Sequence, residues 1–126
     1  MDLVGAYVAQ LGLGENAARG LAGQLLGLIE DTVREQVSFG VAARVRHAVP
    51  EMLDWQLSSP TLRPGTLSLD DFPQAPMLDP RAEWDGLFAR FAVEPQHASK
   101  ARELAMQFLS SRLEPSVMTT VTRALP

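Results

Sequence analysis

The stretch Tyr7-Val8-Ala9-Gln10-Leu11-Gly12-Leu13 recurs in pattern as Leu87-Phe88-Ala89-Arg90-Phe91-Ala92-Val93, and this recurrence decides the fold. Apolar and polar positions coincide at a constant offset. The register continues through the next helix, resumes after a deletion of about four residues in the second copy, and both copies close on Ala-apolar-Pro, at 48–50 and 124–126. Self-similarity of this kind indicates that one supersecondary unit is used twice. The sequence therefore predicts a tandem duplication.

The second copy shows most clearly where its helices begin. Proline follows an acidic residue at 79–80, 94–95 and 114–115. Proline suits the first helical position because its missing N–H has no intrahelical partner there. The acidic residue before it favours the positive end of the helix dipole. We expect helices over 80–92, 95–113 and 115–124, and the alignment then gives 3–12, 15–35 and 39–56, with Pro50 interrupting the last.

Hydrophobic periodicity predicts helices and no strands. Apolar residues recur at i, i+3 and i+4 spacing along one face of the second predicted helix, and no segment alternates as a strand would. That face consists of Ala18, Leu21, Leu25, Leu28, Ile29 and Thr32. The predicted fold class is all-α, a tandem duplication of a three-helix unit packed into one compact helical domain. The first repeat covers 1–56, a proline-rich apolar linker covers 57–79, and the second repeat covers 80–126.

Composition excludes several classes of function. The net charge is −4 and Lys100 is the only lysine, whereas nucleic acid binding depends on clustered Lys and Arg. There is no cysteine, so thiolate chemistry and cysteine metal sites are excluded. No apolar run approaches the roughly 20 residues of a membrane span, and no basic segment precedes an apolar run near Met1. We expect a cytoplasmic protein.

Three glycines in the second predicted helix are the candidate contact residues for a partner. Gly20, Gly23 and Gly27 fall on one stripe, nearly opposite the apolar face. The second copy has Lys100, Glu103 and Gln107 there, an ordinary solvated face. Small residues allow another segment to approach the backbone closely. That segment is the chain's own linker, a partner helix or a second copy of the protein, unless the glycines are merely tolerated.

Other candidate sites favour structural interpretations. Residues 12–17 match a Gly-x-Gly-x-x-Ala dinucleotide turn, but that site needs a preceding strand, and residues 3–12 are predicted to be helical. His47 and His97 lack further ligands at helical spacing, so we interpret them as exposed or capping residues. The basic cluster of Arg34, Arg44, Arg46 and His47 is interleaved with acids, which favours a salt-bridged surface over a helix-turn-helix reader.

The chain also resembles a group of uncharacterised bacterial helical proteins catalogued only as domains of unknown function. The resemblance rests on Leu11-Gly12-Leu13, then Ala18, then Leu25-Leu26-x-Leu28, closing on Ala48-Val49-Pro50. Members of that group have two similar helical units, each ending near Leu-Pro or Val-Pro. The resemblance covers both repeats and not the linker. It implies a fold, and it implies no activity and no functional residue.

With no catalytic, cofactor or metal signature, the sequence does not predict an enzyme. It predicts a non-catalytic protein-interaction or adaptor module, with a protein partner or a homo-oligomer as the complex formed. The alternative is a binder of a small apolar ligand held between the two helical repeats.

Overall fold

The structure is a computed structural model, and it describes residues 2–57 and 80–125, except for the side chains of residues 80–83 and 85. The described residues form seven helices and no strand. The helices are α1 (Leu3–Leu11), α2 (Glu15–Gln36), α3 (Phe39–Ala48), α4 (Met52–Leu57), α5 (Pro80–Arg90), α6 (Pro95–Ser110) and α7 (Pro115–Ala124). The predicted all-α class is confirmed.

The helix boundaries follow the local signals closely. Pro95 and Pro115 occupy the first turns of α6 and α7, as predicted. The third predicted helix is interrupted at Pro50, so that α3 ends at Ala48 and α4 begins at Met52. Leu57 belongs to α4 and not to the linker. The remainder of the predicted linker, residues 58–79, lies outside the described residues.

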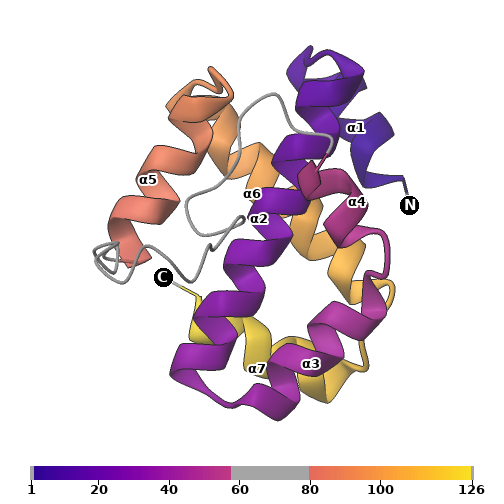
Figure 1. The fold of residues 1–126 in the computed structure, drawn as a ribbon, viewed down its shortest axis with the longest axis vertical. Coiled ribbons are helices and arrows are strands. Elements are labelled where there is room, and N and C mark those ends of the chain that lie inside the picture. The colour runs from indigo at the N-terminus through magenta and orange to yellow at the C-terminus, as the bar shows by residue number, and fades with distance from the viewer. Residues whose placement is uncertain (1, 58–79, 126) are drawn as a thin grey trace, which may run out of the picture.

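Helix α2 forms the centre of the molecule, and the other helices surround it (Figure 1). Residues 20–30 are all buried, on every side of the helix, although the sequence indicated one apolar face. The difference arises because α3 and α4 from the first half and α5, α6 and α7 from the second all pack against α2. A helix covered on all sides loses its solvated face whatever its periodicity.

The described helices do not separate into two independent three-helix units. Helix α1 packs against α6 as well as α2, and the Tyr7 hydroxyl donates a hydrogen bond of 2.7 Å to the Ala101 carbonyl oxygen. Helix α6, the predicted counterpart of α2, buries only one face. The two halves therefore share one hydrophobic core, and the duplication itself stays a prediction.

The two turns that the repeat alignment equates adopt one backbone conformation. Gly12, which ends α1, has φ of 68°, and Ala92, which follows α5, has φ of 54°. Left-handed backbone of this kind ends many helices, and glycine adopts it without a steric cost. Helix α1 also lies where a dinucleotide site would require a strand. The prediction of a helix-to-helix turn at Gly12 is confirmed.

Candidate functional site

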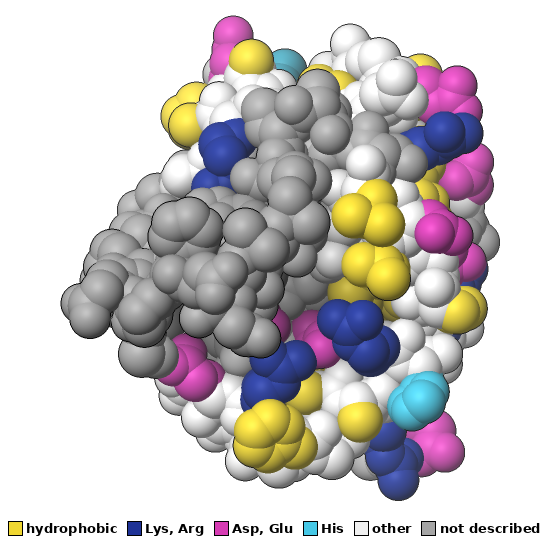
Figure 2. All heavy atoms as spheres, viewed as in Figure 1, with side chains coloured by type: hydrophobic (Ala, Val, Ile, Leu, Met, Phe, Trp, Pro, Cys, Tyr) yellow, Lys and Arg dark blue, Asp and Glu magenta, His cyan; other side chains and the backbone are white. Residues whose placement is uncertain are grey.

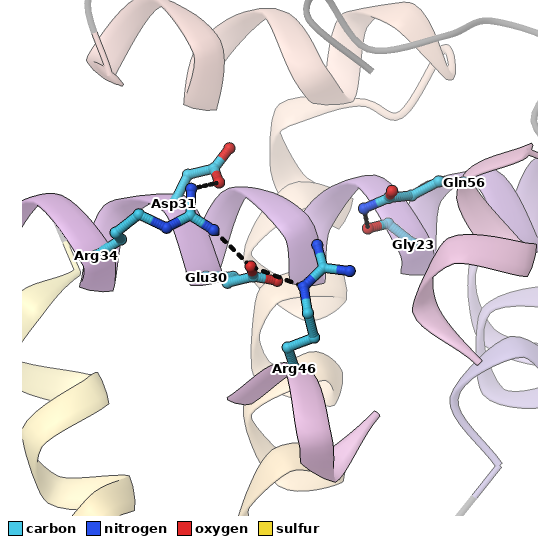
Figure 3. Close-up of polar contacts among 6 residues, drawn as sticks. All are labelled: Gly23, Glu30, Asp31, Arg34, Arg46 and Gln56. Carbon is cyan, nitrogen blue, oxygen red and sulfur yellow. Dashed lines mark hydrogen bonds and ion pairs between the residues drawn. The ribbon is translucent and has the colours of Figure 1, made fainter. Parts of the chain in front are cut away.

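The glycine stripe of α2 lies inside the protein. Gly20, Gly23 and Gly27 are all buried. A Cβ atom added to Gly23 would lie 2.6 Å from the backbone nitrogen of Gln56 and 2.9 Å from the Cβ of Trp55. The side-chain amide of Gln56 also donates to the Gly23 carbonyl oxygen at 3.1 Å (Figure 3).

A segment does approach the Gly23 backbone closely, as the sequence indicated, but that segment is α4. The expected segments were the linker 57–79, a partner helix or a second copy of the protein, and residues 52–56 were expected at the end of the third helix. A partner cannot contact Gly23 while α4 lies there. The stripe therefore explains how α4 packs, and the partner-contact surface has to be sought elsewhere.

A buried carboxylate organises the arginines at the C-terminal end of α2. The Glu30 side chain is only 2% exposed, and its Oε1 atom accepts hydrogen bonds from Arg34 Nη2 at 2.6 Å and from Arg46 Nε at 2.9 Å. Arg34 Nη1 also donates to Asp31 at 3.0 Å (Figure 3). These contacts confirm the predicted salt-bridged surface for Arg34 and Arg46. Among the described residues, Glu30 Oε2 has no hydrogen-bond partner.

Phe39 lies next to this cluster, and among the described residues it is the most exposed large hydrophobic side chain. Phe39, the first residue of α3, is 77% exposed, and Val37 just before it is 43% exposed. The start of α3 is fixed, because the Ser38 hydroxyl accepts a hydrogen bond from the Val41 amide. The Arg34 guanidinium lies 5.9 Å from the centre of the Phe39 ring. Phe39 is therefore held at the surface by its helix, and packing does not cover it.

Helical geometry places Phe39 and Arg46 on one face of α3. They occupy positions i and i+7, and Ala43 lies between them at i+4. We call the set Arg34, Val37, Phe39, Ala43 and Arg46 the Phe39 surface. In Figure 2, arginine or lysine side chains, acidic side chains and hydrophobic side chains adjoin one another near the end of α2 and the start of α3.

Sequence reasoning missed Phe39, although the signal was present. The expected apolar face of the third predicted helix consisted of Val41, Val45, Ala48 and Met52, and Phe39 lies off that register. Because it lies off the apolar face, helical periodicity alone places this aromatic residue outside the core.

The histidines do not assemble a site. His47 and His97 are both exposed, as predicted for structural histidines. Within residues 2–57 and 80–125, no group of three or more His, Asp or Glu side chains is placed to hold a metal ion. No helix in that part of the chain combines the length and apolar character needed to cross a membrane.

Two grooves lined by described residues lie in the second half of the chain. One has a volume of about 450 Å³ between α5 and α6, lined by residues that include Trp84, Phe88 and Arg102. The Arg102 guanidinium lies 4.9 Å from the centre of the Trp84 ring, and burial lowers the pKa of Arg102 below its ordinary value. The other groove, of about 480 Å³, lies beside α7 and includes Met118 and Thr122. Neither lies between the two halves, where the sequence placed an apolar ligand.

Comparison with known proteins identifies no relative. No family model, no curated protein and no solved structure matches the chain. The resemblance to bacterial two-repeat helical proteins therefore stays a prediction, and the argument for function depends on the site alone.

Proposed function

We propose that the protein is a non-catalytic protein-interaction module that binds its partner through the Phe39 surface. The exposure of Phe39 carries the proposal. Covering a phenylalanine side chain contributes roughly 1.5–3 kcal/mol, and this one remains in water although its helix start is firmly capped. An aromatic residue framed by arginines is the composition that protein interfaces concentrate at their centres.

Site-specific photocrosslinking tests the proposal. A benzophenone amino acid is placed at position 39, and for comparison at position 97, which is also exposed, on α6. In a lysate of the source organism, we expect a discrete adduct at position 39 only. An excess of the wild-type chain should suppress the adduct, and an excess of the Phe39→Asp chain should not. Equal labelling at both positions, or competition by Phe39→Asp, would contradict the proposal.

The partner can also be a second copy of this chain. Light scattering over a concentration series then shows a dimer in the wild type that Phe39→Asp abolishes. Because Phe39 is exposed, the substitution should change the free energy of unfolding by no more than about 0.5 kcal/mol. Loss of binding can therefore be separated from loss of folding by recording a denaturation curve for the same sample.

The groove between α5 and α6 supports a second candidate function, the binding of a small apolar ligand. Its volume of about 450 Å³ falls within the range of small-molecule sites, and Trp84 and Phe88 supply aromatic walls. Native mass spectrometry of freshly purified protein tests this function. A bound molecule that Ala98→Trp displaces would support it, and a ligand-free spectrum would count against it.

A further inference from the structure

The hydrogen bond from Arg46 to Glu30 uses Nε and leaves the Nη1–Nη2 edge of the guanidinium without a carboxylate partner among the described residues. Its Nε atom donates to Glu30 Oε1 at 2.9 Å, and within the described residues no hydrogen bond or ion pair reaches Nη1 or Nη2. In Figure 3 both terminal nitrogens point away from the dashed contact to Glu30. The side chain is 52% exposed. Arg46 therefore has two donors, on the Nη1–Nη2 edge of a half-exposed side chain, that no described residue accepts from.

Glu30 fixes the direction of these donors. Its carboxylate is buried in the central helix, and it holds Arg46 through Nε and Arg34 through Nη2 at the same oxygen atom. An arginine held in this way loses less rotamer freedom when it binds a ligand. The Nη1–Nη2 edge matches a carboxylate, which it can bind through two hydrogen bonds at once.

We propose that the Phe39 surface binds an extended acidic segment of a partner protein, which places an apolar side chain on Phe39 and a carboxylate on the Nη edge of Arg46. This inference rests on the proposed function. Seven residues of helix separate Phe39 from Arg46, which is about 10 Å along the axis of α3. An extended chain rises about 3.3 Å per residue, so the apolar and acidic side chains lie about three residues apart.

The charges around the Phe39 surface favour an acidic protein segment over a nucleic acid. Arg34 already donates to Glu30 and Asp31, and Arg44 lies 3.9 Å from Glu114. Within the Phe39 surface, this leaves the Nη1–Nη2 edge of Arg46, about 10 Å along α3 from Phe39, as the pair of donors without a partner among the described residues. Nucleic acids are bound by arrays of cations, and the chain as a whole carries a net charge of −4.

Peptide display on the full chain tests the inference. Random dodecapeptides are selected against the wild type and counter-selected against Phe39→Asp, and the enriched peptides are measured by fluorescence anisotropy. We expect an apolar residue with Asp or Glu about three positions away. Arg46→Gln should weaken these peptides roughly tenfold or more, because a charge-assisted bidentate contact is lost.

Two variants separate the role of Arg46 from general charge. Arg46→Lys keeps the charge but lacks the two-donor edge, so it should recover only part of the affinity. Arg44→Gln removes a cation elsewhere on α3, and it should leave affinity within about twofold, as expected for a rim charge. The affinity of the wild type should fall with added salt, and that of Arg46→Gln should fall less. Denaturation curves establish that each variant is folded.

The outcomes distinguish the two proposals. Peptides that need Phe39 but carry no acid, or that bind Arg46→Gln as tightly as wild type, would overturn the acidic segment and leave the interaction surface standing. Failure to enrich any peptide that discriminates against Phe39→Asp would count against both. Binding of a labelled single-stranded oligouridylate that depends on Phe39 and Arg46 would overturn the acidic segment in favour of a nucleic acid.

Discussion

Replacing Gly23 with alanine tests the packing at the centre of the molecule. In a helix interior this change ordinarily stabilises by up to about 1 kcal/mol, because glycine has more backbone entropy to lose. At Gly23 the new Cβ would stand 2.6 Å from the backbone nitrogen of Gln56. Carbon and nitrogen atoms in contact lie about 3.5–4 Å apart, so α4 must move by about 1 Å.

The movement of α4 sets the size of the effect. Met52 and Gln56 are buried against the rest of the molecule, and the Gln56 amide donates to the Gly23 carbonyl oxygen at 3.1 Å. Overpacking of a core costs about 1–3 kcal/mol, and a backbone atom yields less easily than a side-chain end. The lost hydrogen bond adds about 1 kcal/mol. After the propensity gain is subtracted, we expect Gly23→Ala to destabilise by about 1–3 kcal/mol.

Gly86 provides the matched control. It also lies inside a helix, α5, but the nearest atom to its added Cβ is the flexible Arg90 Nη1 at 3.8 Å. Gly86→Ala should therefore stabilise by up to about 1 kcal/mol. Urea denaturation followed by far-ultraviolet circular dichroism gives both values. If the two substitutions stabilise equally, α4 does not lie on Gly23 and the account of the stripe is wrong.

Three other predictions concern single features of the fold. Burial raises the pKa of Tyr7 above its ordinary value of 10.0, so the folded state keeps a proton that the unfolded state loses. The free energy of unfolding should therefore fall as the pH rises through 10, and Tyr7→Phe should remove the part of this fall that tyrosine ionisation causes. The near-ultraviolet absorbance of this single tyrosine should show ionisation only when the protein unfolds. Replacing both Arg34 and Arg46 with alanine should destabilise by about 1 kcal/mol more than the sum of the two single variants, because either arginine alone still pairs with the buried Glu30 carboxylate. Additive effects in a double-mutant cycle would contradict this prediction. Gly12→Ala should destabilise and Ala92→Gly should stabilise, each by about 1 kcal/mol in thermal unfolding, because both positions have positive φ; equal signs would refute the shared turn conformation.

The sequence predicted the helices well because their boundaries depend on local chemistry. Pro95 and Pro115 favour the start of a helix whatever path the chain takes afterwards, because proline restricts its own backbone locally. The same local restriction makes Pro50 interrupt a helix. The arrangement of the helices depends on contacts between residues far apart in the chain. The hydrogen bond from Tyr7 to Ala101 joins the two halves, and nothing in the pattern around either residue indicates the other.

The candidate site was predicted only in part. A glycine stripe indicates that some segment packs closely on the helix but does not identify that segment, whereas an exposed aromatic residue such as Phe39 can be recognised from its position in the helix. The stripe of Gly20, Gly23 and Gly27 correctly indicated a close approach to the helix backbone, but the approaching segment cannot be read from the glycines. Helix α4 packs on Gly23 because the chain leaves the helical path between Ala48 and Met52, and the direction that α4 then takes depends on tertiary packing. Phe39 needed no tertiary knowledge, since its position off the apolar register of α3 is visible in the sequence.

The central position of α2 favours the end of this helix as the place of the proposed partner surface. Along residues 20–30 every side of α2 is covered, so nothing there is available to a partner without unfolding. The cover ends where α2 passes into α3, and there Arg34 becomes half-exposed while Glu30 stays buried. The buried Glu30 carboxylate orients the side chains of Arg34 and Arg46 and so connects the core to the surface. Phe39 lies beside that point, so the proposed partner segment would contact its aromatic ring and the Nη1–Nη2 edge of Arg46.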